Sequence, residues 1–430
     1  MKYKNLLIKI LAATLCAVAC FSATACNGGS STATSTQSNS TIKDREMTNG
    51  PVYDGVELST SLWQTPEYLE SPEDDRTEEG VNIKALYYRT VYKNEETYAF
   101  AYLGIPEGVS ATNKAPAVLL IHGGAGSAYW EWVKAWNDRG YVALAMDLEG
   151  HVPTKEGTLG SSHTELYTKS KYPAPSNHNY DDSRLPLEET WMYYAVQTSI
   201  IGNSLLHGLD FVDNQKIGVC GVSWGSVITS IITGYDDRFA FSIPIYGTVG
   251  LHGKGGVLAS YYDKNPDALI WDDPEGLKKS ETPMLFLCGN TDVSFSTRGI
   301  TDTALACKNS SIIVVKDFLH SQYHATIMSE PYLFADEVIN GKKHLITFDT
   351  QPVQEGGKIK ITIPQGNSVD RVYLVYTDED LMNVATWRKK NLELNGNEIT
   401  YEVPSEAKNF YIQVEDGYGK YASTGVIEVE

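Results

Sequence analysis

A single serine lies between two glycines at the point where one apolar run gives way to another. Residues 218–226 read GVCGVSWGS, with Ser223 flanked by Gly221 and Gly225. Small residues on both sides suit a sharp turn from a strand into a helix, because the chain passes close to its neighbours there. Such a turn lifts the serine to the carboxyl end of the sheet, and the following helix points its N-terminus at the same place, which favours developing negative charge. The pattern predicts a nucleophilic serine.

A nucleophilic serine needs a base, and the base needs an acid that orients it. The turn at Ser223 resembles that of α/β-hydrolases, in which the chain order is serine, acid, histidine and each residue follows a strand of the sheet. The run PMLFLCGNTD ends at Asp292, and the next run, SIIVVKDFLH, ends at His320. We therefore predict Asp292 as the acid and His320 as the base. His324 is the alternative base, or it lines the pocket or caps a helix, and Asp317 and Glu330 are weaker candidates for the acid.

A glycine-rich turn follows an earlier apolar run, because residues 115–126 read APAVLLIHGGAG. Turns of this kind supply a second backbone N–H donor for the oxyanion of an acyl-transfer reaction. We assign the first donor to the backbone N–H of Trp224 and the second to that of Gly124. His122 is expected to hold the turn in place.

The elements that must position these residues alternate between short apolar runs and longer mixed segments from about residue 81 to 345. VNIKALYYRT and TYAFAYLGIP resemble an antiparallel pair, and APAVLLIHGG, YVALAMDLEG, KIGVCGVSWG, AFSIPIYGTV, PMLFLCGNTD and SIIVVKD follow. Runs that are apolar on both faces suit strands buried between two layers of helices, and the segments between them are long enough for crossover helices. We predict an α/β fold with a doubly wound, mostly parallel sheet. Within it, residues 148–190 form a long polar segment of the kind that is functional or disordered.

Beyond residue 346 the pattern changes to alternating apolar and polar residues, as in KIKITIP and RVYLVYTD. Asn395-Gly396 lies between two such runs, which indicates a hairpin. We predict a small all-β sandwich over residues 346–430, after a catalytic domain over residues 51–345. The sandwich binds a glycan or packs on the catalytic domain, and the lack of a clear aromatic platform favours packing.

The first 25 residues have a basic start, an apolar stretch and the small residues ATA before Cys26, which predicts a secretion signal and not a membrane span. The sequence around Cys26 resembles a bacterial lipobox, with Ala23 where leucine is usual, and this resemblance implies cleavage before Cys26 and lipid attachment to its sulfur. Residues 26–50 are then a disordered tether rich in serine and threonine. The expected location is the bacterial cell surface, or the medium if no lipid is attached.

The formal net charge is −19, and removal of three signal-peptide lysines leaves −22. This charge makes nucleic acid, or an anionic lipid surface beyond the N-terminal anchor, an unsuitable partner for the folded part. The cysteines beyond Cys26, which are Cys220, Cys288 and Cys307, are too few and too far apart for a disulfide framework, and no metal-ligand spacing occurs.

Together these motifs resemble those of the α/β-hydrolase superfamily. More narrowly, the segments GVCGVSWGSVITSIITGYDDRFAFSIPIYGT, WDDPEGLKKSETPMLFLCGNTDVSFS and FLHS resemble those of secreted bacterial acetylxylan-esterase-like hydrolases, many of which carry a C-terminal immunoglobulin-like domain. Ser226 stands where a further glycine is common. The resemblance implies a serine esterase that removes short acyl groups, above all acetyl, from a glycan or oligosaccharide without a metal or organic cofactor. Trp191, Trp271 and His324 are candidate substrate-binding residues.

Two other functions fit the same motifs. A serine peptidase of the prolyl-oligopeptidase type shares the triad order, but residues 27–80 are too short for its usual propeller, which leaves an aminopeptidase without one. A non-catalytic glycan-binding lipoprotein is the other alternative. The sequence determines neither the acyl length nor the oligomeric state.

Overall fold

A computed structural model gives the structure of residues 56–78, 81–161, 163–175, 180–342, 345–348, 350–363, 369–380, 386–394 and 396–430. The predicted signal peptide, Cys26 and the predicted tether lie outside these residues. No helix in the described ranges is both long enough and apolar enough to cross a membrane.

A ten-stranded sheet forms the centre of the structure, with the order β1-β3-β4-β6-β5-β9-β10-β11-β12 and with β2 paired to β3. Its strands are β1 (Tyr68–Glu70), β2 (Arg76–Glu78), β3 (Val81–Tyr92), β4 (Glu95–Gly104), β5 (Ala115–Ile121), β6 (Val142–Met146), β9 (Val212–Val222), β10 (Phe241–Ile245), β11 (Met284–Gly289) and β12 (Ser310–Val315). The pairs β5–β6, β5–β9, β9–β10, β10–β11 and β11–β12 are parallel, whereas β3 and β4 form the predicted antiparallel pair. The prediction of a mostly parallel sheet with a mixed N-terminal edge is confirmed, and the chain has the α/β-hydrolase fold.

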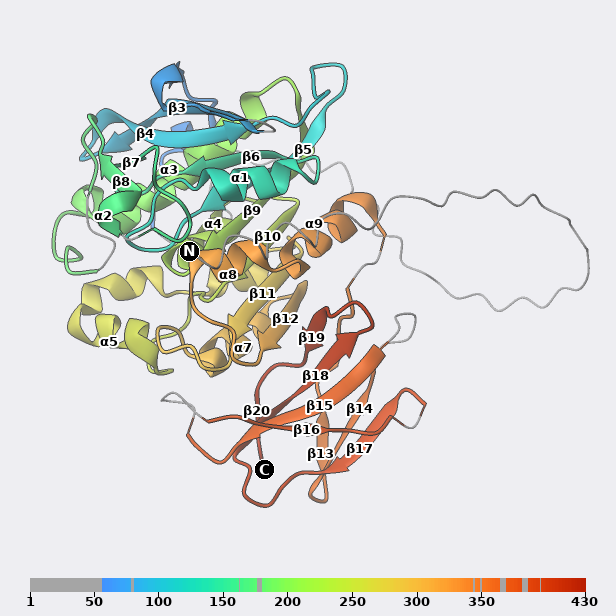
Figure 1. The fold of residues 1–430 in the computed structure, drawn as a ribbon. Helices are drawn as coiled ribbons and strands as arrows, with labels where there is room; N and C mark the ends of the chain where they lie inside the picture. The colour runs from blue at the N-terminus through green and yellow to red at the C-terminus, as the bar shows by residue number, and fades with distance from the viewer. Residues whose placement is uncertain are drawn as a thin grey trace, which may run out of the picture. The chain divides into compact units, whose positions relative to one another are not determined.

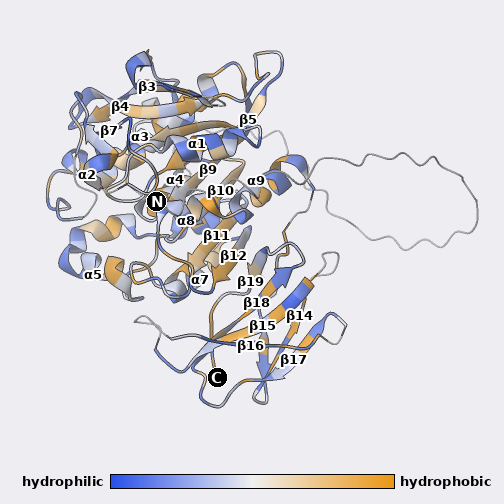
Figure 2. Cartoon of the chain, viewed as in Figure 1, coloured by the Kyte–Doolittle hydropathy of each residue, from blue (hydrophilic) through white to orange (hydrophobic). Residues whose placement is uncertain are grey.

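Helices cover both faces of this sheet (Figure 1). They are α1 (Trp130–Asn137), α3 (Trp191–Gly208), α4 (Trp224–Tyr235), α5 (Gly256–Lys264), α6 (Glu275–Lys279), α7 (Thr297–Ala306), α8 (Gln322–Ile327) and α9 (Glu330–Asn340), with 3-10 turns η1 (Thr60–Trp63), η2 (Pro72–Asp74), η3 (Leu187–Glu189) and η4 (Pro266–Trp271). Strand β5 shows why both faces must be apolar: Leu119 packs with the core that includes α3 and α4, and Leu120 packs with the core that includes α1 and α9. Figure 2 shows the hydrophobic residues concentrated on these central strands.

The long segment 148–190 is partly regular in the ranges that the structure describes. It contains β7 (His151–Pro153), the short helix α2 (His163–Leu166) and β8 (Tyr167–Lys169), and β7 pairs antiparallel with β8. Residues 162 and 176–179 of this segment lie outside the described ranges.

Two antiparallel sheets form the C-terminal part, as predicted. One has the order β13-β14-β17 and the other β16-β15-β18-β19 with β20 paired to β18. The strands are β13 (Val353–Glu355), β14 (Lys358–Thr362), β15 (Val369–Thr377), β16 (Arg388–Asn391), β17 (Glu398–Glu402), β18 (Asn409–Asp416), β19 (Tyr421–Ser423) and β20 (Ile427–Glu428). The predicted hairpin at Asn395-Gly396 is wrong, because β16 and β17, which flank it, belong to different sheets; Asn395 itself is outside the described residues.

One half-buried histidine, whose two ring nitrogens are buried, gives the fold a dependence on pH. His207 lies in the last turn of α3, and neither of its ring nitrogens has a hydrogen-bond partner among the described residues. Burial, helped by the positive charge of Arg238, lowers the pKa of His207 to about 4. In the unfolded chain this ring has its ordinary pKa of about 6.5. The free energy of unfolding therefore decreases as the pH falls from about 6.5 toward 4, because the unfolded state takes up a proton that the folded state does not. Above a pH of about 6.5 this histidine makes no change in stability with pH.

We expect the variant His207→Gln, which cannot titrate, to lose less stability on acidification than the wild type. The difference between the two losses should be about 2 kcal/mol between pH 7 and pH 5. Urea unfolding of both proteins at the two pH values measures it. Equal losses in both proteins would show that His207 is protonated in the folded state or plays no part.

Candidate active site

Ser223 lies at the turn between β9 and α4. Its backbone has φ 58° and ψ −120°, in a region that residues other than glycine rarely adopt. The Ser223 N–H donates to the Ile245 carbonyl at 2.9 Å, so the neighbouring strand β10 holds the turn. The chain thus stores strain at the one residue that the sequence singles out as a nucleophile.

The two positions that flank Ser223 require glycine, because backbone atoms occupy the space that a side chain would need. A Cβ on Gly221 would lie 2.2 Å from the Gly225 carbonyl oxygen, and a Cβ on Gly225 would lie 2.1 Å from the carbonyl oxygen of Ile121. Real Cβ atoms do not approach so closely, so helix α4 can begin immediately after Ser223 only if both positions are glycine.

Ser223, His320 and Asp292 lie within hydrogen-bonding distance of one another in series. His320 Nε2 is 2.8 Å from Ser223 Oγ, and His320 Nδ1 is 2.6 Å from Asp292 Oδ2. Asp292 follows β11 and His320 follows β12, and these strands are parallel neighbours whose carboxyl ends meet at one edge of the sheet. The arrangement can pass a proton from a serine hydroxyl to an imidazole that a carboxylate orients.

The acid and the imidazole are each held from more than one side. The Asp292 side chain is fully buried, and its Oδ1 accepts hydrogen bonds from the backbone N–H groups of Ser294 and Phe295 at 2.8 and 3.2 Å. The Phe295 ring stacks on the His320 ring with centroids 5.8 Å apart, and the Tyr246 ring lies 4.8 Å from it. The carboxylate keeps its second oxygen for His320, and the aromatic rings restrict rotation of the imidazole.

The two predicted oxyanion donors lie on the two segments next to the serine. The N–H of Trp224 is the first in α4 and has no intrahelical acceptor, as at any helix start. The glycine-rich turn reaches Ser223 as well, since a Cβ on Gly123 would lie 3.1 Å from the Ser223 Cβ. Gly124 follows it directly, and the parallel register of Ile121 with Gly221 brings this turn to the serine.

A buried group of polar side chains behind the glycine-rich turn fixes its shape. His122 Nδ1 is 2.6 Å from the Gly123 carbonyl oxygen, the Ala125 N–H donates to Glu149 Oε1 at 2.8 Å, and His151 Nδ1 is 2.8 Å from the Gly126 carbonyl oxygen. These contacts reach the backbone of the turn at three of its residues. They agree with the expectation that His122 is structural.

The protonation of His122 follows from its two hydrogen bonds. Its Nε2 accepts a hydrogen bond from the Leu148 N–H at 3.0 Å, which requires a neutral ring with the proton on Nδ1. Burial lowers the pKa of His122, but the Asp147 carboxylate, whose Oδ1 is 3.7 Å from Nε2, raises it by more, with help from Glu149. The net pKa lies above the ordinary value, so acidification would protonate Nε2 and break the bond from Leu148.

The other predicted candidates lie away from the triad contacts. His324 Nδ1 is 2.7 Å from Ser321 Oγ, the hydroxyl that caps the start of α8. The alternative acids face elsewhere: Asp317 pairs with Lys316, and Glu330 accepts a hydrogen bond from the Tyr421 N–H. Neither carboxylate contacts His320 in the structure.

The two predicted substrate-binding tryptophans are buried. Trp191 is 1% exposed, its indole N–H donates to the Leu148 carbonyl oxygen, and its ring packs edge-on against Trp224. We therefore correct its expected role from contact with substrate to support of Trp224. Trp271 is 4% exposed and lines a cavity of about 210 Å³ together with Tyr180 and Asp182.

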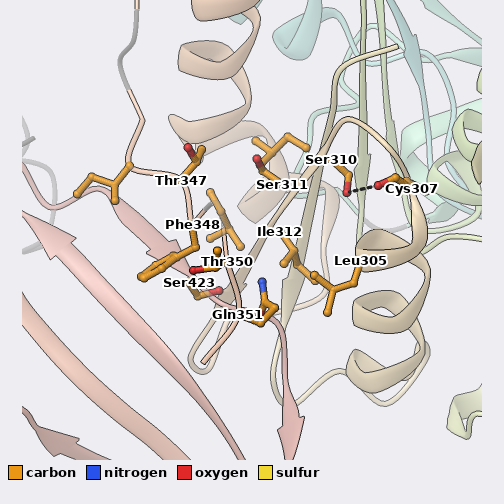
Figure 3. A pocket seen from close by; sticks show the side chains of 13 residues that line it. Leu305, Cys307, Ser310, Ser311, Ile312, Thr347, Phe348, Thr350, Gln351 and Ser423 are labelled. Atoms are coloured by element: carbon orange, nitrogen blue, oxygen red, sulfur yellow. Dashed lines mark hydrogen bonds between the residues drawn. The ribbon is translucent and has the colours of Figure 1, made fainter. Parts of the chain in front are cut away.

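A second cavity, of about 290 Å³, lies near the amino ends of β11 and β12, at the opposite end of these strands from the triad. Figure 3 shows the side chains that line it. It is lined by the first residues of β11 and β12, including Leu285 and Ser310, and by Phe348 and Gln351 of the segment that leads to the C-terminal sheets. Because parallel strands carry the triad at their carboxyl ends, this cavity is no part of the candidate site. The residues that the structure describes contain no cluster of three or more groups suited to hold a metal ion.

Comparisons with known proteins find distant similarity. No family model matches the chain. A stretch covering 32% of this chain is 29% identical to the probable dipeptidyl-peptidase 5 of Emericella nidulans and covers 16% of that protein. A longer stretch, 47% of this chain, is 25% identical to dipeptidyl-peptidase 5 of Aspergillus fumigatus and covers 27% of it. The chain therefore spans less than a third of the length of these curated relatives.

Among solved structures, acetyl xylan esterase 1 from Thermoanaerobacterium sp. JW/SL YS485 superposes with a TM-score of 0.48 and 14% sequence identity. The superposition covers 69% of this chain and 97% of that one. The strand order and the turn at Ser223 are the observations on which we base the fold assignment.

We expect Gly225→Ala to displace the turn at Ser223, because the new Cβ must move away from the Ile121 carbonyl. A fluorophosphonate probe that labels activated serines should react with the variant at least about tenfold more slowly than with the wild type, since a displacement of 1 Å in such a site costs on the order of 100-fold. Gly160→Ala is the matched control, because a Cβ there meets nothing within 4 Å. Labelling of a folded Gly225→Ala variant at the wild-type rate would contradict the steric argument.

Proposed function

We propose that this protein is a serine-dependent hydrolase of carboxylic esters that forms an acyl-enzyme. One observation supports the proposal above the others: the continuous hydrogen-bonded series from Ser223 Oγ through the His320 ring to the buried carboxylate of Asp292. The fold does not need three hydrogen-bonded side chains of this kind at a strained turn at the carboxyl ends of the strands.

In the proposed first half-reaction, Ser223 Oγ attacks the ester carbonyl carbon and His320 Nε2 takes the hydroxyl proton. Asp292 keeps the imidazole in the tautomer that has the proton on Nδ1 and stabilises the imidazolium that forms. The tetrahedral intermediate then collapses, the bond to the leaving oxygen breaks, and His320 gives its proton to the departing alcohol.

The negative charge of the tetrahedral intermediate falls at the junction of α4 and the glycine-rich turn. We assign its donors to the backbone N–H groups of Trp224 and Gly124. Loss of one such donor typically costs about 3 kcal/mol of transition-state stabilisation. The start of α4 adds the favourable end of its helix dipole.

In the second half-reaction, water attacks the acyl carbon while His320 takes its proton, and Ser223 leaves with that proton restored. The groups required for both halves belong to the chain or are water. The proposal thus needs neither a metal nor an organic cofactor.

For the substrate we propose a short acyl ester, most simply an acetyl ester, of a glycan or oligosaccharide. The support is the resemblance of the serine, acid and histidine segments to those of acetylxylan-esterase-like hydrolases. Trp191, a candidate substrate-binding residue, is buried and offers no stacking surface to a sugar. We also propose that the chain is lipidated at Cys26 on a bacterial cell surface, away from nucleic acid.

The second candidate is a serine peptidase, above all an aminopeptidase, because the chain matches part of two fungal dipeptidyl-peptidases. The same triad would attack an amide in place of an ester. A non-catalytic glycan-binding protein is the third candidate, but it leaves the series Ser223–His320–Asp292 without a role.

The test is hydrolysis of p-nitrophenyl acetate by residues 27–430, beside the variant Ser223→Ala, with release of acetate from acetylated xylan and cleavage of an aminoacyl p-nitroanilide measured in parallel. We expect ester turnover that falls by at least about 1000-fold in the variant, since loss of a triad serine removes the acyl-enzyme route. Acetate release from xylan would support the glycan ester.

Faster cleavage of the aminoacyl amide than of the ester would replace the esterase proposal with the peptidase. Folded protein that neither turns over these substrates nor reacts with a fluorophosphonate would leave the binding protein as the better description. Thermal unfolding of the Ser223→Ala variant checks that any loss of activity is not a loss of structure.

A further inference from the structure

One buried asparagine connects the two loops that carry Asp292 and His320. Asn290 comes directly after β11, two residues before Asp292, and it is 4% exposed. Its side-chain Oδ1 accepts a hydrogen bond from the Asp317 N–H at 2.9 Å, three residues before His320. Its own N–H donates to the Val315 carbonyl oxygen at the end of β12. Movement of Asn290 therefore moves both loops.

The remaining polar groups of Asn290 are held by the C-terminal sheets. The Trp387 indole N–H donates to the Asn290 carbonyl oxygen at 2.8 Å, and Asn290 Nδ2 donates to the Tyr411 hydroxyl at 3.2 Å. Tyr411 lies on β18 of the sheet β16-β15-β18-β19, and Trp387 directly precedes β16, a strand of the same sheet.

Both aromatic side chains are rigidly enclosed. Trp387 is 6% exposed and Tyr411 is fully buried, and their rings meet edge to face with centroids 5.4 Å apart. Together with Tyr373, Val375 and Val426 they belong to the same hydrophobic core as α3, α4 and α7. The β16-β15-β18-β19 sheet thus packs on the catalytic part as an extension of its core.

Other hydrogen bonds between the two parts do not reach the triad loops. The Val426 N–H donates to Thr301 Oγ1 on α7 at 3.2 Å. The N–H of Val314, on β12, donates to Ser423 Oγ, on β19, at 2.7 Å. These contacts join the C-terminal sheets to the catalytic part without touching Asn290.

We propose that Trp387 and Tyr411 are positioning residues that act through Asn290 to hold Asp292 and His320 at hydrogen-bonding distance. The C-terminal sheet is then a component of the active site, although none of its side chains touches the reacting atoms. This inference rests on the proposed serine mechanism. It adds to that mechanism a requirement for groups more than 60 residues beyond the histidine in the chain.

The triad requires that the position of the His320 imidazole be tightly fixed. A triad needs its imidazole held within about 0.5 Å of the productive position by neighbours that are themselves fixed. The loop after a strand has few such neighbours of its own. Asn290 makes two of its hydrogen bonds to buried aromatic groups. Tyr411→Phe removes the hydroxyl acceptor and keeps the ring, whereas Trp387→Phe removes the indole N–H donor together with part of the ring system.

The test compares the full chain with Trp387→Phe, Tyr411→Phe and the double variant. The readouts are the rate of labelling of Ser223 by a fluorophosphonate, in which Oγ bonds to phosphorus and fluoride leaves, and kcat and KM for p-nitrophenyl acetate over pH 5–9. We expect the double variant to react about tenfold or more slowly in labelling and in kcat, with KM changed by less than about twofold. Each single variant keeps one contact to Asn290 and should lose less.

The pH profile separates positioning from general destabilisation. If the Asp292 contact to His320 loosens, the imidazolium loses stabilisation, so the acidic limb of the kcat/KM profile should move to lower pH in the double variant. Thr301→Val is the matched control, because it removes a buried hydrogen bond between the same two parts that does not reach Asn290. It should lower the melting temperature and leave the labelling rate and the pH profile unchanged.

Labelling at the wild-type rate in a folded double variant would overturn the inference, and so would an equal slowing in Thr301→Val. If the double variant does not fold, the two single variants decide by the same criteria. A wild type that is labelled but does not hydrolyse the ester, with slower labelling in the aromatic variants, would overturn the proposed substrate and support this inference.

Discussion

The close approach of helix α4 to the end of strand β5 is the constraint on which the rest of the site depends. Ser223 adopts a strained backbone conformation because α4 must begin at once, and α4 can begin at once only because Gly225 leaves room for the Ile121 carbonyl. The same approach brings the glycine-rich turn to the serine. The proposed nucleophile and the two proposed oxyanion donors are therefore brought together by one packing contact of backbone on backbone.

Parallel strands explain why so much of this arrangement was predictable from the sequence. Runs that are apolar on both faces, such as 115–121 and 284–289, identify buried parallel strands, and such strands end at the same edge of a sheet. Residues that directly follow them must converge. Asp292 and His320 were selected by that rule and Ser223 by its flanking glycines, and the structure places His320 within hydrogen-bonding distance of both Ser223 and Asp292.

The parts that were not predicted depend on contacts that a local pattern does not contain. Tyr246 and Phe295 enclose the His320 ring, and Glu149 holds the glycine-rich turn, but each is an ordinary residue in its own segment. Tyr246 directly follows β10, so the strand-end rule could have identified it. Trp191 was a candidate substrate-binding residue but is buried, because composition alone does not distinguish a buried ring from an exposed one.

The links from Asn290 to Trp387 and Tyr411 have a consequence for how the chain is made. Synthesis runs from the N-terminus, and domains form as their residues emerge. The strand and helix around Ser223, β9 and α4, emerge before β18, which carries Tyr411 and lies far downstream in the chain. A nascent chain would thus contain the proposed nucleophile long before it contains the groups proposed to hold the Asp292 and His320 loops. On this proposal the site matures only after β18 has been made, so a product released from the ribosome before β18 would carry Ser223 without those groups.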